Sequence, residues 1–404
     1  MKKKIFTAAI LMSFLTAQAL PAYCAGKMTR KQKKEMVLIN AAATSFKDKQ
    51  YEISIEFYTK AIQLNNENPD SYTGRGNAEF LSGKYKEAVL DYSKAIELDP
   101  GREHLHYNRA IAKVNLNSYD EVLEDYTKEI EINPENSNAY LNRGTTKVML
   151  NKYDEAVDDF SKVIELDEKN ELAYYNRGIA KRNKGDYNGA IEDYSKVIEL
   201  NPVNIDAYNN RGVAKFYLKD YKGAVSDYSK VIEMKPTYKR ANYNRGIANL
   251  GLKNYEEAIL DFTKEIELYP DNDSAYYERA IAFSRLDKYT SALDDYAKAI
   301  ELNPDNADYY AERGALISKS EGDLQKAEQD LNKAIQLDDK DSEKYLTRAI
   351  IFCKRNLYLA AIDDLNIVLK MDEKNTQAYD LRSFAIKSMN AEQKDSTGVR
   401  WFVL

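Results

Sequence analysis

The sequence predicts an all-α protein: an α-solenoid of about ten helix-turn-helix repeats followed by a C-terminal capping helix. Three observations support this prediction. An arginine recurs every 34 residues, with one interval of 35. Apolar and small residues lie at helical spacing between the arginines, and many intervals close with proline, which cannot continue a helix. The arginines are Arg75, Arg109, Arg143, Arg177, Arg211, Arg245, Arg279, Arg313, Arg348 and Arg382.

The first element, residues 1–25, is expected to be a secretory signal peptide. Lysines at residues 2–4 supply a positive start, and residues 5–20 form an uncharged, mostly apolar run that is short for a membrane span. Small residues suitable for cleavage follow, and the mature chain can begin after either Cys24 or Ala25. We therefore expect an exported protein, periplasmic or secreted, of a bacterial envelope.

Composition narrows the classes of partner. The formal net charge is −6, which argues against nucleic acid as a partner. Loss of Cys24 with the signal would leave Cys353 as the only cysteine, so no intramolecular disulfide could form. Residues 26–34 form a basic lead-in, and membrane contact is expected at most through this N-terminal segment.

The repeat array is expected to occupy residues 35–375 when each arginine is taken as position 7 of its unit. Position 4 is usually Tyr and position 8 is Gly or Ala, on one stripe of a first helix. Tyr at position 17, Ala at position 20 and an aromatic residue at position 24 share a face of a second helix. A capping helix, residues 376–389, and a tail, residues 390–404, follow. Most first helices are preceded by a capping residue: Asn68, Asn136, Asn170, Asn204, Asn272, Asn306, Asp341 and Asn375.

This pattern resembles the tetratricopeptide repeat, which has a bulky aromatic residue at position 4, Gly or Ala at 8, Ala at 20, an aromatic at 24 and Pro at 32. The resemblance covers residues 35–375. It implies a right-handed superhelix whose first helices line a concave groove. In that family the groove typically holds other polypeptides.

Arginine at position 7 departs from the family, which usually has leucine there. A charge in a packing seam needs a partner, and position 23 supplies an aspartate. Pairing within a unit is favoured, although pairing across units also fits the spacing. We expect these ion pairs to set the stacking register rather than bind a ligand. They are Arg109 with Asp125, Arg143 with Asp159, Arg177 with Asp193, and Arg211 with Asp227.

Position 6 is asparagine in five consecutive units, and in the family this position faces the groove. A side-chain amide both donates and accepts, so a row of amides can bind the main chain of an extended peptide. The row resembles the asparagine ladders of O-linked N-acetylglucosamine transferase and importin alpha. The alternative is that these asparagines are only hydrated surface residues. The predicted groove residues are Asn108, Asn142, Asn176, Asn210 and Asn244, with Tyr107, Tyr175 and Tyr243 at position 5.

Residues for catalysis or cofactor binding are not expected. The only histidines, His104 and His106, are two residues apart on one helix and point to different faces, so they are not a chelating pair. No phosphate-binding glycine loop is present. We therefore predict neither an enzyme nor a cofactor or metal site.

The leading hypothesis is an exported, non-enzymatic scaffold that binds a protein or peptide along its concave groove, in envelope or extracellular protein assembly. An alternative is a structural spacer that self-associates through its ends or convex surface. An unrecognised enzyme is a third and weaker hypothesis.

Overall fold

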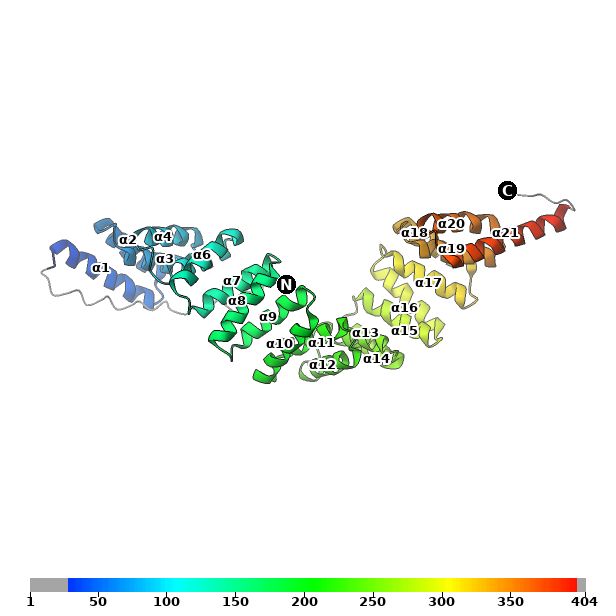
Figure 1. The fold of residues 1–404 in the computed structure, drawn as a ribbon, viewed down its shortest axis with the longest axis horizontal. Helices are drawn as coiled ribbons and strands as arrows, with labels where there is room; N and C mark the ends of the chain where they lie inside the picture. Colours follow the sequence, from blue (N-terminus) through cyan, green and yellow to red (C-terminus); the bar gives the residue numbers. More distant parts are fainter. Residues whose placement is uncertain (1–27, 398–404) are drawn as a thin grey trace. The chain divides into compact units, whose positions relative to one another are not determined.

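The computed structural model of the protein describes residues 28–397, and every regular element in this range is an α-helix (Figure 1). For these residues the prediction of an all-α protein of paired helices is confirmed. The predicted signal peptide and residues 398–404 of the tail lie outside the described range. The helices are α1 (Arg30–Lys47), α2 (Tyr51–Leu64), α3 (Pro69–Leu81), α4 (Tyr85–Leu98), α5 (Leu105–Asn115), α6 (Tyr119–Ile132), α7 (Ser137–Met149), α8 (Tyr153–Leu166), α9 (Glu171–Asn183), α10 (Tyr187–Leu200), α11 (Ile205–Tyr217), α12 (Tyr221–Met234), α13 (Ala241–Gly251), α14 (Tyr255–Leu268), α15 (Asp273–Arg285), α16 (Tyr289–Leu302), α17 (Ala307–Lys319), α18 (Leu324–Leu337), α19 (Ser342–Lys354), α20 (Tyr358–Met371) and α21 (Thr376–Thr397).

The chain divides into two compact units, Met1–Ala207 and Tyr208–Leu404. The boundary falls inside α11, where the repeat pattern continues without a break in composition. Within each unit a helix packs mainly against the helices next to it in sequence. This is the behaviour expected of a repeat array, in which each repeat contacts only its neighbours.

A short turn joins the two helices of each pair and contains a residue in the left-handed conformation. Gly83 and Gly185 occupy this place in two turns, with φ of 81° and 90°. Glycine adopts such angles without steric cost. After the first of these turns, the backbone N–H of Lys84 donates to the carbonyl of Glu79 at 2.8 Å. The bond satisfies a carbonyl at the helix end and reverses the chain.

Small residues at position 8 let the helices of a pair approach closely. A Cβ placed on Gly178 would lie 2.8 Å from the ring of Tyr194, and one placed on Gly144 would lie 2.9 Å from the ring of Phe160. Both rings are fully buried. The stripe of small residues on the first helix and the aromatic residue on the second therefore form one packing seam.

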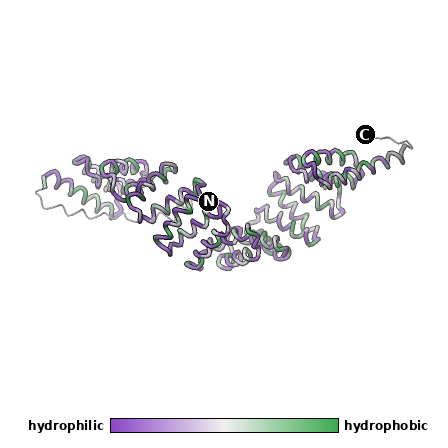
Figure 2. Tube along the Cα trace, in the orientation of Figure 1, coloured by the Kyte–Doolittle hydropathy of each residue, from purple (hydrophilic) through white to green (hydrophobic). Residues whose placement is uncertain are grey.

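Polar and apolar residues alternate along the helices, as Figure 2 shows. Each helix accordingly buries one face and leaves another in water. Among the described residues no helix is both long and apolar enough to span a membrane.

The N-terminal boundary differs from the predicted one. Helix α1 begins at Arg30 rather than at residue 35, because Thr29 and Gln32 form a capping box. The backbone N–H of Gln32 donates to the Thr29 hydroxyl at 3.2 Å, and the backbone N–H of Thr29 donates to the Gln32 side chain at 2.9 Å. Much of the basic lead-in is therefore helical.

Candidate functional site

In the units from residue 69 to residue 375, the position-7 arginine meets the position-23 aspartate of the same unit. The unit at residues 35–68 has Ala41 and Phe57 at these positions. The guanidinium directs two N–H groups at the carboxylate, for example from Nε and Nη2 of Arg177, an arrangement that gives strong charge-assisted bonds. The aspartates are almost fully buried. The four expected pairs are Arg109–Asp125 at 2.5 Å, Arg143–Asp159 at 2.6 Å, Arg177–Asp193 at 2.7 Å and Arg211–Asp227 at 2.7 Å.

The same arginines also reach the preceding unit. Nη1 of Arg109 donates to the Ser93 hydroxyl at 3.1 Å, and Nη1 of Arg143 donates to the Thr127 hydroxyl at 3.1 Å. Each of these guanidinium groups thus links the second helix of its own unit to the second helix of the preceding unit. The ion pair therefore lies within the unit, and only a neutral hydrogen bond crosses to the preceding unit.

Lysines at position 11 share the same buried carboxylates. Nζ of Lys113 lies 3.0 Å from Asp125, and Nζ of Lys147 lies 2.9 Å from Asp159. Burial alone would raise the pKa of Asp125, but hydrogen bonds from His106 and Arg109 outweigh it and lower the pKa to about 2. Lys181 with Asp193 and Lys215 with Asp227 repeat the contact. The charges of the position-11 lysines are therefore balanced by the buried aspartates of the packing seams.

In residues 28–207, the position-6 amides do not form an open row. Asn142 and Asn176 are only 4% and 6% exposed, and Nδ2 of Asn142 donates to the Tyr107 hydroxyl at 3.0 Å. Tyr107 is itself 5% exposed. The expectation that Asn142, Asn176 and Tyr107 line an open groove is therefore wrong, because these side chains are consumed in packing between repeats. Asn108 and Tyr175 are half-buried.

In residues 208–397, the position-6 side chains reach the surface more fully. Asn210 and Asn244 are half-buried, and Tyr243 packs against Phe262 with ring centroids 5.8 Å apart. The next two units carry Glu278 and Glu312 at the same position. The sequence reasoning missed them because it followed asparagine rather than the position itself.

Glu278 is a partly buried carboxyl group with no cation beside it. It makes no ion pair or hydrogen bond among the described residues, and burial raises its pKa to about 7. Glu312 is more exposed, and its pKa is raised because burial outweighs the opposing charge of Arg285. Burial and the charges of Glu312 and Glu278 also raise the pKa of Tyr277. Tyr277 and the uncompensated carboxyl of Glu278 thus share one surface, which favours a cationic ligand.

Two buried glutamates replace the missing asparagine caps of α5 and α13. Each of these helices begins after a left-handed residue, His104 with φ 69° and Arg240 with φ 67°. The Glu129 carboxylate accepts the backbone N–H of His104 at 2.9 Å, and Glu265 occupies the same position of its unit. A signal for both was present in the sequence. Among the units after the first, Glu stands at position 27, where the others have Ala or Val, only in the two units that lack the capping residue.

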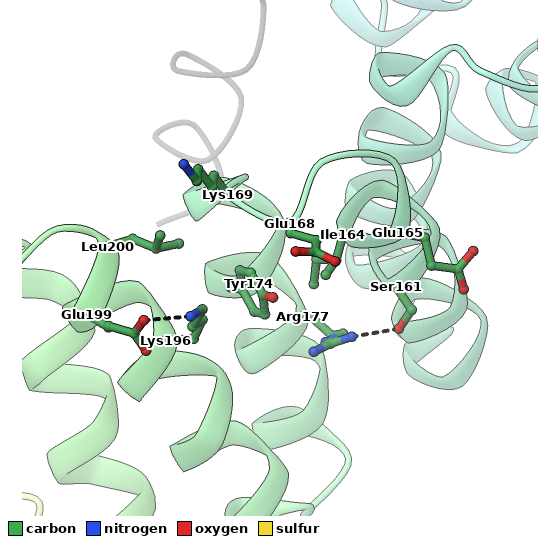
Figure 3. A pocket seen from close by; sticks show the side chains of 10 residues that line it. All are labelled: Ser161, Ile164, Glu165, Glu168, Lys169, Tyr174, Arg177, Lys196, Glu199 and Leu200. Carbon is green, nitrogen blue, oxygen red and sulfur yellow. Dashed lines mark hydrogen bonds and ion pairs between the residues drawn. The ribbon is translucent and has the colours of Figure 1, made fainter.

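A shallow pocket of about 550 Å³ lies among α8, α9 and α10 (Figure 3). Its polar side chains bind one another. Nη1 of Arg177 donates to the Ser161 hydroxyl at 3.0 Å, and Nζ of Lys196 donates to Glu199 at 2.7 Å. Because both contacts recur in other repeats, the pocket is a feature of the packing and we do not take it as the binding site.

The two histidines lie in separate contacts. His106 is 8% exposed with Nδ1 3.4 Å from Asp125, whereas Nδ1 of His104 lies 3.1 Å from Glu129. The hydrogen bond to Glu129 raises the pKa of His104. Within residues 28–397, His, Cys, Asp and Glu side chains do not gather into a group of three that could hold a metal ion.

Family models match stretches that together span more than half of the chain. No curated protein matches it. The model described as TPR repeat matches residues 76–117, 147–185 and 180–218, and models described as tetratricopeptide repeat match residues 126–158, 205–238, 239–272, 274–306 and 307–341.

Several solved structures resemble this chain. YrrB, described as a TPR protein with an unusual peptide-binding site, is 25% identical over 45% of this chain and 94% of its own, with a TM-score of 0.41. A tetratricopeptide repeat protein from Parabacteroides merdae is 23% identical over 62% of this chain and 99% of its own, with a TM-score of 0.45. Yeast Tom70 is 20% identical over 91% of this chain and 90% of its own, with a TM-score of 0.40.

Proposed function

Because this chain belongs to the tetratricopeptide repeat family, whose members are repeat scaffolds for protein–protein interaction, we propose that it holds extended polypeptide segments against its first helices. Its role is binding rather than catalysis. In this role the protein is exported and binds its polypeptide ligands during the assembly of envelope or extracellular proteins.

The observation that carries the proposal is the surface around Glu278. Tyr243 and Tyr277 offer half-buried rings, and Glu278 offers a desolvated carboxyl without a protein cation. Leaving such a group unpaired costs free energy that a bound lysine or arginine would recover. This surface fits a polypeptide segment that carries both cationic and apolar side chains.

Asn244 extends this surface. It occupies position 6 one repeat before Glu278 and is half-buried. In the proposal its amide bonds to the main chain of the ligand, which makes binding tolerant of ligand sequence.

Binding of a lysine-containing peptide is expected to strengthen several-fold between pH 6 and pH 8. The pKa of Glu278 is about 7, so its carboxyl gains charge over this range, while the lysine of the peptide keeps its own. The probes are two glycine- and serine-rich peptides that carry leucine and either lysine or glutamate, without strict alternation of apolar and charged residues. Fluorescence anisotropy with the full chain measures their affinity.

The variant Glu278→Gln is expected to bind the lysine peptide weakly and without the pH step. Glu256→Gln removes the same charge from an exposed position on α14 and should behave like the unmodified protein. Equal affinity for the glutamate peptide would contradict the proposal, as would a pH step that survives in Glu278→Gln.

Export is expected to remove the signal peptide, so that the mature protein begins at Ala25 or Gly26. N-terminal sequencing of protein recovered from the envelope and medium of a bacterial host checks this outcome. A charge in the apolar run, Leu11→Asp, should retain the full-length chain in the cytosol. Recovery of unmodified protein starting at Met1 in the cytosol would refute export.

A further inference from the structure

The last helix, α21, repeats the first half of a unit. It continues past the predicted end at residue 389 to Thr397. Its Ala378 and Ala385 are fully buried and belong to the same core cluster as residues of α20. Nη1 of Arg382 donates to Asn366 at 2.8 Å, which is the contact that other arginines make with the preceding unit. Helix α21 is therefore docked like every other first helix.

In the units from residue 69 to residue 375, two contacts hold the second helix on the first. The arginine at position 7 pairs with the aspartate at position 23, as Arg348 does with Asp364 at 2.7 Å. The small residue at position 8 lies beneath the residue at position 24, so that a Cβ on Gly246 would lie 2.7 Å from the ring of Phe262. The first helix therefore recognises a second helix by the aspartate at position 23 and the large apolar or aromatic residue at position 24.

On α21 the corresponding side chains are exposed or half-buried, and no second helix among residues 28–397 covers them. Ser383 occupies position 8, which is buried in the complete units, yet it is exposed. Tyr379 and Ile386, at positions 4 and 11, are 44% and 38% exposed. Arg382 at position 7 makes no ion pair with a carboxylate of the described residues. We call these four residues the open strip.

We propose that the open strip docks an amphipathic α-helix of another protein that carries aspartate directly before Tyr, Phe or Leu. The aspartate would pair with Arg382 through two parallel hydrogen bonds, and the residue after it would cover Ser383. Small apolar residues three positions before the aspartate and three positions after the aromatic residue would complete the match. The sequence Ala292–Ala299 of this chain shows the pattern, with Asp295 and Tyr296 at its centre.

The given sequence does not supply this helix to α21. Residues 398–404 contain neither aspartate nor glutamate, so they offer Arg382 no side-chain carboxylate. The second helices α14, α16, α18 and α20 are each packed on their own first helices. The lack of a side-chain carboxylate disfavours residues 398–404 as the occupant, and the packing of the second helices disfavours a second copy of this chain. Charge complementarity with Arg382 therefore favours an aspartate-bearing helix from a different protein.

The probe is a peptide of residues 288–303, which contains α16. Isolated helices of this length are marginal in water, so a lactam between positions 290 and 294, both exposed in α16, holds it helical. Fluorescence anisotropy measures its binding to the full chain. We expect binding that weakens about 10–100-fold with Asp295→Asn in the peptide, and equally with Arg382→Gln in the protein. Combining the two changes should cause little further loss.

The control Arg285→Gln removes an exposed arginine from α15 and should leave binding unchanged. Ser383→Trp should block the strip while circular dichroism shows that the fold is kept. Equal binding of the Asp295→Asn peptide overturns the proposal. It is also overturned if the peptide binds only after residues 398–404 are deleted, or if the protein dimerises and Arg382→Gln makes it monomeric.

Discussion

Replacing Asp159 with asparagine is expected to destabilise its repeat by about 3–5 kcal/mol, the usual cost of removing one partner from a buried ion pair. Asp159 is 3% exposed, with Arg143 at 2.6 Å and Lys147 at 2.9 Å. Asp159→Asn leaves Arg143 in the seam without a counter charge and leaves Lys147 with only the exposed Glu155, at 3.6 Å. Repeat arrays need not unfold in one step. The destabilisation should therefore be measured both by urea unfolding and by hydrogen exchange of the backbone amides of α7 and α8.

The neighbouring residue provides the control. Asp158 is exposed, so Asp158→Asn removes the same charge from the surface and should change stability by no more than about 0.5 kcal/mol. Replacing the whole group, with Asp159→Leu, Arg143→Leu and Lys147→Met together, should recover part of the loss, since no unpaired charge remains. Equal effects of Asp158→Asn and Asp159→Asn would show that the ion pairs do not hold the seam.

The second large effect is expected at position 11, where Glu79→Lys should stabilise the protein by about 1–3 kcal/mol. Glu79 is 7% exposed and stands where the next unit has Lys113. Burial and the nearby charge of Asp91 raise the pKa of Glu79 to about 8. A lysine there would contact Asp91 as Lys113 contacts Asp125. The reverse change, Lys113→Glu, should destabilise by a similar amount.

The gain from Glu79→Lys should depend on pH. The pKa of Glu79 in the folded protein lies above its usual value, so the folded state favours the protonated form. Its contribution to stability is therefore lost as pH rises from about 4.5 to about 8. Urea unfolding of the two proteins should differ more at pH 8 than at pH 5. Glu67→Lys, at an exposed site before α3, is the matched control, and an equal gain there would contradict this account.

The fold was predictable because its signals are periodic. A 34-residue spacing, small residues at position 8 and rings at position 24 leave few packings other than stacked helical hairpins. The same spacing favoured Asp125 and Asp159 as the partners of Arg109 and Arg143, and the structure decided for pairing within the unit over pairing across units. The exceptions at Glu129 and Glu265 could also be predicted from the sequence, because both repeats lack the asparagine or aspartate cap of the first helix and carry glutamate at position 27.

The candidate site was less predictable. Asn142 and Asn176 share a position with Asn244, yet the first two are buried and the third is half-buried. The preceding repeats differ: Asn142 donates to the hydroxyl of Tyr107 at position 5 of the repeat before it, whereas position 5 of the repeat before Asn244 is Asn209. Spacing assigns a residue to a face of a helix, but the accessibility of that face depends on the neighbouring repeat.

By itself, the sequence determined the repeat and its helix pairs and favoured the aspartate partners of its buried arginines, because each depends on spacing along one chain. Only the tertiary structure decided which polar groups stay available to a ligand. It showed that Asn142, Asn176 and Tyr107 are buried between repeats and that Glu278 and the open strip are accessible. The physical reason is that burial is a property of the contacts between helices.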